Sequence, residues 1–137
     1  MEQKDKDLLL KDLCARLPYK TKIQLTEYSD LTGEKLPNKI KILDYCMLGR
    51  VQAYCKGFRK DEIKPYLFPL SSMTDEQCYE LSSIRSGFQD CWKYIKTPIP
   101  LSICNFEQID WFHKNHFDYR GLIEKSLAID ATNLNIY

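Results

Sequence analysis

Two histidines, His113 and His116, are the only imidazole side chains in this chain of 137 residues. Residues three apart lie on the same side of a helix, and metal sites use histidines at this spacing. The specific metal-binding helices add a glutamate between the histidines, whereas Lys114 and Asn115 stand there in this sequence. We therefore expect His113 and His116 to border a contact between helices, with a metal site formed by the two as the alternative.

Six cysteines are the other residues that could do chemistry, as metal ligands, disulfides or nucleophiles. The closest two are nine positions apart, so the two-residue spacing typical of structural zinc ligands is missing. Most of them have apolar neighbours at spacings that face a core, where a free thiol packs as a small hydrophobic group. We expect reduced core thiols in a reducing compartment. The six are Cys14, Cys46, Cys55, Cys78, Cys91 and Cys104.

The motifs of nucleophilic and nucleotide-binding sites are missing from the sequence, which contains no GxSxG, no GxxxxGK and no GxGxxG. Its five glycines do not cluster, and a cysteine–histidine pair would have to be assembled in three dimensions. A metal- or thiol-dependent enzyme is therefore the last of the functions considered. We expect no catalytic residue and no cofactor.

The composition favours a single folded domain over residues 1–137. Hydrophobic residues make up 44% of the chain and the net charge is +1, which is enough apolar material for a core and unlike a disordered chain. The polar residues 1–5 do not begin a secretory signal, and the longest apolar runs fall far short of the ~20 residues that span a membrane. We expect a cytoplasmic protein without membrane contact.

A helix at residues 4–17 is the first of the elements that position these side chains. Leu9, Leu13 and Leu17 recur every four residues on one face. Pro18 ends the helix, because proline excludes helical geometry from the residue before it.

A small antiparallel sheet is expected over residues 20–64, where apolar and polar side chains alternate. The turn residues of 29–38 predict a loop within it, and the prolines of 64–69 indicate an extended connector after it. An SH3-like partial barrel is one arrangement of such a sheet. The expected strands are 21–26, 39–47, 50–55 and a short one at 58–63.

Two helices are expected in the second half of the chain. The first, at 74–96, starts with a capping box formed by Thr74 and Gln77. The second, at 105–117, starts with the favourable capping residue Asn105. The order of helix, sheet and helices predicts the α+β class.

The tail at 118–137 mixes leucine and isoleucine with polar residues, and its pattern fits no single element. It belongs to one of three segments that together resemble a family of small uncharacterised proteins encoded by gut anaerobic bacteria and by their phages and mobile elements. The segments are LLLKDLCARLPY at 8–19, IKPYLFPLSSMT at 63–74, and DYRGLIE at 118–124 with LAIDA at 127–131. The strand region, with its 33–38 loop, lies outside the resemblance. The resemblance implies an accessory protein in the bacterial host cytoplasm and carries no known activity.

Charge is divided unevenly along the chain. Residues 20–64 hold ten Lys and Arg against six acids, a net charge of +4, whereas 69–137 hold six against nine, a net charge of −3. A basic sheet with interleaved aromatic rings could bind single-stranded nucleic acid by stacking and phosphate contacts. Lysines that protect an edge strand from aggregation are the simpler explanation. The candidate residues are Tyr45, Tyr54, Arg50, Lys56, Arg59 and Lys60.

Trp111 is the candidate anchor of a protein interface. It falls nearly opposite Ile109 on the 105–117 helix, where it is either exposed or covered by the tail at 122–129. Our first hypothesis is a non-catalytic accessory protein that binds a protein partner, with self-association included. A small nucleic-acid-binding module on the basic sheet is the second.

Overall fold

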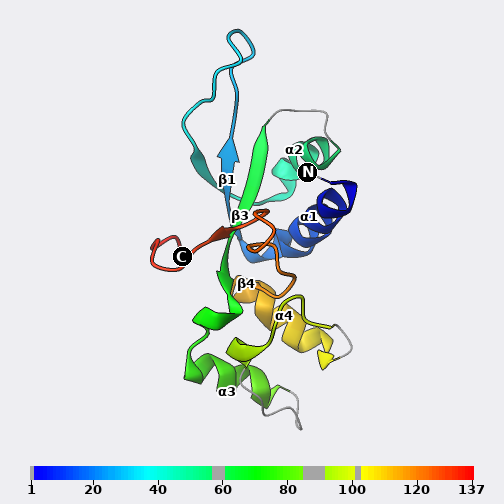
Figure 1. Ribbon diagram of the computed structural model, residues 1–137, viewed down its shortest axis with the longest axis vertical. Helices are drawn as coiled ribbons and strands as arrows, with labels where there is room; N and C mark the ends of the chain where they lie inside the picture. The colour runs from blue at the N-terminus through cyan, green and yellow to red at the C-terminus, as the bar shows by residue number, and fades with distance from the viewer. Residues whose placement is uncertain (1, 57–60, 85–91, 101–102) are drawn as a thin grey trace.

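A computed structural model of the chain describes residues 2–56, 61–84, 92–100 and 103–137. The predicted α+β class is confirmed, with an N-terminal helix, a small sheet and C-terminal helices (Figure 1). The elements in chain order are α1 (Gln3–Arg16), β1 (Lys22–Thr26), β2 (Lys39–Ile42), α2 (Leu48–Cys55), β3 (Glu62–Pro69), α3 (Asp75–Ser83), α4 (Phe106–Lys114), β4 (Phe117–Asp118) and β5 (Ile129–Asp130).

The sheet is mixed, with the strand order β2–β1–β3–β4 and with β5 also paired to β3. β1 runs antiparallel to β2 and β3, so that Leu25 stands opposite both Lys39 and Ile63. β4 and β5 are short and run parallel to β3. The predicted antiparallel pairing is therefore correct for β1, β2 and β3. β4 and β5 pair in parallel with β3, so the sheet is mixed and is not the SH3-like barrel considered from the sequence.

The central strand β3 lies largely where the sequence predicted a connector at 64–69. Proline is tolerated in a strand where its nitrogen does not have to donate. Pro65 stands opposite Ile23 in the last pair of the β1–β3 ladder, and the next residues of β3, Tyr66 and Leu67, pair with β5. The segment with the prolines is therefore extended, as predicted, but it is a strand of the sheet and not a connector after it. The predicted strand at 58–63 falls partly on residues 57–60, outside the described residues.

The predicted third strand at 50–55 is wrong, because these residues form α2. Val51 and Cys55 are both buried and stand four residues apart, so their spacing suits one face of a helix as well as alternation in a strand. A 3-10 turn at Tyr45–Met47 precedes α2, and the Asp44 carboxylate accepts a hydrogen bond from the Met47 amide, 3.2 Å away. The predicted strand at 39–47 therefore ends at Ile42.

The predicted capping box at Thr74 and the predicted cap at Asn105 are confirmed, and Asn105 also forms a capping box with Gln108 that was not predicted from the sequence. α3 ends at Ser83 instead of 96, and residues 85–91 lie outside the described part of the chain. α4 ends at Lys114 instead of 117, because His116 has a positive φ of 60° and the chain then enters β4.

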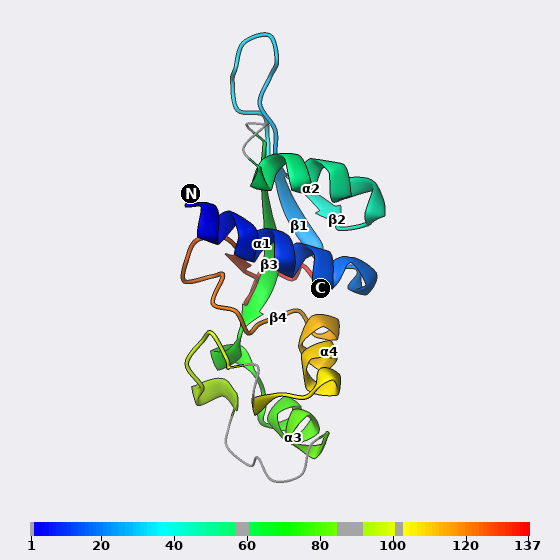
Figure 2. The same ribbon diagram turned by 90° about the vertical axis from the view of Figure 1, so that its right-hand side faces the viewer.

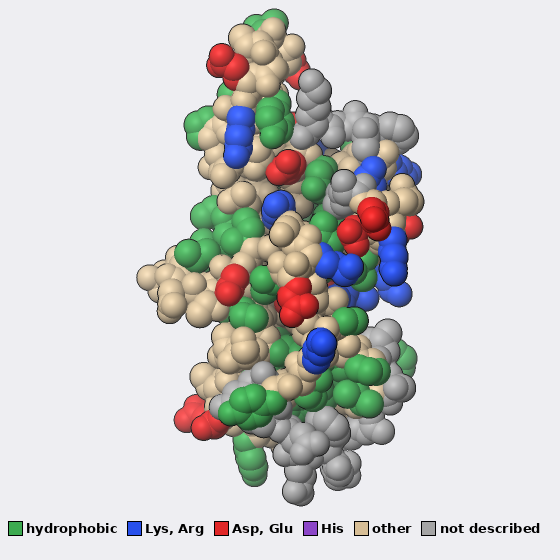
Figure 3. Space-filling view, in the orientation of Figure 1, with side chains coloured by type: hydrophobic (Ala, Val, Ile, Leu, Met, Phe, Trp, Pro, Cys, Tyr) green, Lys and Arg blue, Asp and Glu red, His purple; other side chains and the backbone are tan. Residues whose placement is uncertain are grey.

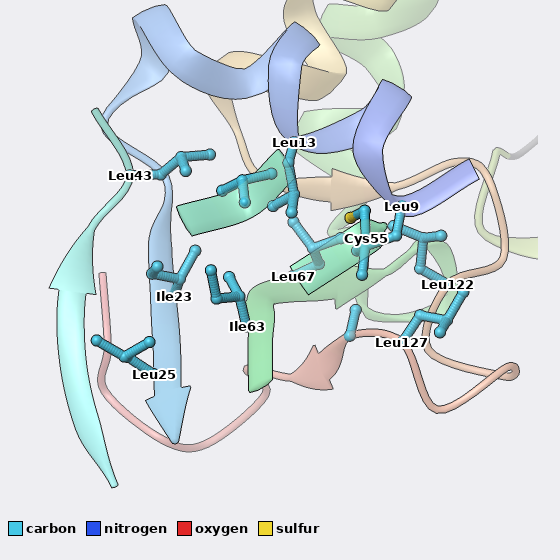
Figure 4. Close-up of a cluster of buried hydrophobic side chains, with 12 residues drawn as sticks. Leu9, Leu13, Ile23, Leu25, Leu43, Cys55, Ile63, Leu67, Leu122 and Leu127 are labelled. Carbon is cyan, nitrogen blue, oxygen red and sulfur yellow. The ribbon is translucent and has the colours of Figure 1, made fainter. Parts of the chain in front are cut away.

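Two clusters of buried side chains fill the interior. The sheet core lies between the sheet and helices α1 and α2, which cover the same face (Figure 2). In Figure 4, Leu9 and Leu13 of α1 lie over Ile23 and Leu67 of the strands. The helical core lies at the other end of the molecule, around Trp92, Phe112, Phe117 and Tyr119.

The cysteines divide between core and surface. Cys55 and Cys78 are buried as predicted, whereas Cys14 and Cys46 are exposed, against the prediction. Burial raises the pKa of the Cys55 thiol to about 11, which keeps it protonated and unreactive near neutral pH. Cys104 is half-buried, and Cys91 lies outside the described residues.

Candidate interaction surface

A hairpin arm, residues 27–38, joins β1 to β2 and projects beyond the rest of the molecule (Figure 1). The arm is held by its own backbone hydrogen bonds. The Ser29 amide donates to the Glu34 carbonyl and the Gly33 amide to the Ser29 carbonyl, both at 2.8 Å. Gly33 has a φ of 71°, a conformation that glycine adopts without strain. The loop predicted at 29–38 is thus an ordered turn within a longer arm.

The tip of the arm carries an apolar side chain between two acids. Leu31 is 98% exposed, and Asp30 and Glu34 flank it in sequence. Hydrophobic and carboxylate side chains both appear at this end of the molecule in Figure 3. A single exposed leucine is common on protein surfaces. Here it stands on a protruding, hydrogen-bonded turn, which is a geometry suited to insertion into a partner.

Strand β2 forms an edge of the sheet, since β1 is the only described strand paired with it. The Leu43 amide donates to the Thr21 carbonyl at 2.8 Å, on the β1 side. Amide directions alternate along a strand, so the amides of Ile40 and Ile42 point away from β1. The edge therefore presents free backbone donors and acceptors at these two residues.

The two faces of β2 differ in chemistry. Lys39 and Lys41 stand opposite Leu25 and Ile23 of β1, on the face that the helices cover. Ile40 and Ile42 lie on the other face, where they are 54% and 51% exposed. An incoming strand would therefore meet lysines on one face and isoleucines on the other.

The charge around this edge is positive. Glu27 at the base of the arm lies 3.6 Å from the Lys39 amine and 3.7 Å from the Arg50 guanidinium. Lys41 forms no ion pair with any residue that the structure describes. Lys39 and Lys41 are the charged residues of β2 itself, so the strand carries two positive charges beside its exposed backbone.

The residues proposed for nucleic-acid binding do not line one sheet face, because Arg50, Tyr54 and Lys56 belong to α2 or to its C-terminal cap. Tyr54 is half-buried against the sheet core, and burial with the Glu62 charge raises the pKa of its hydroxyl. Tyr45 is exposed in the preceding 3-10 turn. Lys56 is exposed, and the remaining two candidates, Arg59 and Lys60, lie outside the described residues.

Trp111 is buried, with 6% of its surface exposed, which corrects its proposed role as an exposed anchor. Its ring stacks on Phe117 with centroids 5.6 Å apart, and its Nε1 donates to Glu80 Oε1 at 2.9 Å. Phe112 packs edge-on at 6.0 Å. The Trp111 side chain therefore packs in the helical core and against α3, although the helical pattern of the sequence placed it on the outer face of its helix.

The two histidines point to different partners. His113 Nε2 lies 2.8 Å from the Tyr119 hydroxyl, whereas the His116 ring stacks on Tyr137 with centroids 3.8 Å apart. Burial, reinforced by the Arg16 charge, lowers the pKa of each imidazole to about 4. Among the described residues, no group of three or more His, Cys, Asp or Glu side chains is placed to hold a metal ion.

A buried ionic junction, formed by Asp12, Arg16, Arg120 and the Phe117 carbonyl, was not foreseen from the sequence. Arg16 donates through Nε to Asp12 at 2.7 Å and through its Nη2 to the Phe117 carbonyl at 2.7 Å. Arg120 reaches the second Asp12 oxygen at 3.0 Å. The four-residue spacing of Asp12 and Arg16 was its only local signal, and such pairs are common on exposed helices.

Comparison with protein-family models, curated proteins and solved structures gives no match to this chain. Across the described ranges, no helix has both the length and the apolar character needed to cross a membrane. Evidence for function therefore comes from the geometry of the arm, the β2 edge and the cavities.

Proposed function

We propose that the protein acts by binding a partner protein, and that it takes an extended segment of that partner onto the edge of β2. The observation that carries this proposal is the pair of outward amides at Ile40 and Ile42 on an uncovered edge. Addition of a strand to such an edge is a common mode of peptide recognition, in which backbone hydrogen bonds supply affinity and alternate side chains supply specificity.

The chemistry of β2 selects the partner segment. Residues directly opposite each other on paired strands lie on the same face and interact. Lys39 and Lys41 favour acidic residues at alternate positions of the partner strand, and Ile40 and Ile42 favour apolar residues between them. The preferred segment therefore alternates acidic and apolar side chains.

A second copy of this chain fits the edge less well. Antiparallel pairing of β2 with itself around a twofold axis places Lys39 and Lys41 of one copy opposite the lysines of the other. Like charges at opposed positions destabilise a strand pair. The lysines thus protect the edge from self-pairing while leaving it open to an acidic strand.

The arm adds a second contact to the same partner. It begins at the end of β1 and leads directly into β2, so a protein bound along the edge lies beside it. Leu31 would then pack into an apolar depression of the partner. The resemblance of segments 8–19, 63–74 and 118–131 adds to the proposal that this binding serves an accessory protein of a phage or mobile element in the bacterial cytoplasm.

Titration calorimetry with two peptides tests the proposal. The acidic peptide alternates glutamate and valine, and the basic peptide has lysine in place of each glutamate. We expect the acidic peptide to bind at least tenfold more tightly than the basic one, because the edge carries a net positive charge. Equal affinities, or no binding of either peptide, would contradict the proposed recognition.

A pair of variants separates backbone pairing from simple charge attraction. Ile40→Pro removes one outward amide, whereas Ile40→Val keeps it and serves as the matched control. We expect Ile40→Pro to abolish binding of the acidic peptide and Ile40→Val to preserve it. A single-stranded oligothymidine is the third probe, since tight salt-sensitive binding of this probe together with no peptide binding would favour the nucleic-acid alternative.

A further inference from the structure

A cavity of about 570 Å³ lies on the opposite side of α1 from the sheet core. One wall is the helix face that carries Lys4, Leu8 and Lys11, which stand four and three residues apart and so point the same way. The other walls come from residues 98–99 and from the segment that follows β4. The volume is that of a typical small-molecule site.

The floor of the cavity is apolar and firmly held. Ile99 and Tyr119 line it, and both are almost fully buried members of the helical core. The Ile99 amide donates to the Tyr119 carbonyl at 2.9 Å, which ties the two segments together. The Tyr119 hydroxyl is already engaged by His113 at 2.8 Å, so the floor offers a ligand mainly apolar surface.

The rim of the cavity carries more bases than acids, with Lys4, Lys11, Arg120 and Lys125 against Asp5 and Asp7. Arg120 is fixed between the Asp12 carboxylate, 3.0 Å from its Nε, and the Tyr119 ring, 4.9 Å from its guanidinium carbon. Lys125 pairs with Asp5 at 3.3 Å. Lys4 and Lys11 form no ion pair with the described residues, and the one acid between them on this helix face is Asp7, so the two lysines leave a net positive charge at the mouth.

We propose that this cavity binds a small amphipathic anion, an organic carboxylate, phosphate or sulfonate with an apolar body. The body would lie on Ile99, Tyr119 and Leu8, and the anionic group would lie between Lys4, Lys11 and Arg120. A purely inorganic anion would leave the apolar floor exposed to water. A neutral hydrophobic molecule would leave the lysines without a counter-charge.

The test uses anilinonaphthalene sulfonate, a fluorescent dye with an aromatic body and one sulfonate. We expect saturable binding to the folded protein, with NMR amide shifts concentrated at residues 98–99 and 119–125. The double variant Lys4→Gln/Lys11→Gln should weaken binding by about fivefold to tenfold, because it removes two charge-assisted contacts. Lys39→Gln/Lys41→Gln makes the same change of charge on β2, and its affinity should stay within twofold of the unmodified protein.

A third variant tests the cavity itself. Leu8→Trp fills the space from the α1 wall and should abolish dye binding, while an unchanged far-UV circular dichroism spectrum shows that the protein has folded. Inorganic phosphate should not displace the dye. The proposal is overturned if the lysine variant binds as well as its control, if the amide shifts map elsewhere, or if phosphate competes. Displacement of the dye by the acidic peptide would overturn the proposal as well, because it would show that the cavity is part of the site that binds the partner protein.

Discussion

The ionic junction and the β2 edge use the same kinds of side chain in opposite ways. At the junction, Asp12 and Arg16 are both fully buried and lie 2.7 Å apart. At the edge, Lys39 and Glu27 are partly exposed and lie 3.6 Å apart. A buried charge must keep its partner or cost several kcal/mol, whereas an exposed pair contributes little to stability. The junction therefore maintains the fold, whereas the charges of the edge can be changed with little effect on stability.

The junction also joins the first of the resembling segments, 8–19, to the third at 118–124, and a separate backbone hydrogen bond joins the second, 63–74, to the third at 127–131. Asp12 and Arg16 lie in the first segment, Arg120 lies in the third, and Leu67 of the second accepts a hydrogen bond from the Ala131 amide at 2.8 Å. The arm and β2 lie outside all three segments.

Loss of the junction should have the largest effect. Arg16→Met leaves Asp12 buried with Arg120 alone and frees the Phe117 carbonyl, so we expect the free energy of unfolding to fall by about 3 kcal/mol. Urea denaturation measures the change. Lys11→Met on the exposed side of the same helix is the control, expected within about 0.5 kcal/mol. A loss below about 1 kcal/mol for Arg16→Met would contradict the structural role of the junction.

Acid should destabilise the protein through its buried histidines. Each folded-state pKa is about 4, below the value of about 6.5 for a free imidazole, so the unfolded chain binds protons that the folded protein does not. Stability is therefore lost as the pH falls from about 6.5 toward 4. The expected loss between pH 7 and pH 5 is on the order of 1–2 kcal/mol per histidine.

His116→Phe isolates one of these contributions, because phenylalanine can keep the stacking on Tyr137 without titrating. Urea midpoints at pH 7 and pH 5 should differ less in this variant than in the unmodified protein. Asp118 provides no explanation for a loss in acid, since burial raises its pKa and its protonation opposes the effect. An unchanged pH dependence in His116→Phe would show that its ring does not control acid sensitivity.

Charge reversal at the edge should change binding with little change in stability. Lys39→Glu/Lys41→Glu should reverse the preference of the protein from the acidic to the basic peptide, because each partner residue then faces the opposite charge. The free energy of unfolding should change by less than about 1 kcal/mol, since both side chains are exposed. A large loss of stability would show that Lys39 and Lys41 maintain the fold, as the residues of the junction do.

The arm should give the smallest effect. Leu31→Ser removes the exposed side chain from a turn held by backbone hydrogen bonds, so stability should stay within about 0.5 kcal/mol. Affinity for the natural partner should fall severalfold, and affinity for the short peptides should stay the same, because they do not reach the arm. Weaker peptide binding by the Leu31→Ser variant would show that the arm and the β2 edge form a single binding site, against this prediction.

The sequence predicts correctly those features that depend on interactions between residues close together in the chain. The capping box at Thr74, the capping residue Asn105 and the apolar stripe of α1 follow from neighbouring residues, and the structure confirms them. The alternation of residues 50–55 predicts a strand, but these residues belong to helix α2, because alternation over a few residues also fits one face of a helix. The junction links residues more than a hundred positions apart, so the local spacing of Asp12 and Arg16 could not reveal it.

Hydrogen exchange of the β2 amides, measured by NMR with and without the acidic peptide, tests the central claim most directly. Ile40 and Ile42 should exchange rapidly in the free protein, since their amides point outward, and should become protected when the peptide binds. Lys41, whose amide faces β1, should be protected in both states. Peptide binding that leaves the Ile40 and Ile42 amides unprotected would contradict strand addition at this edge.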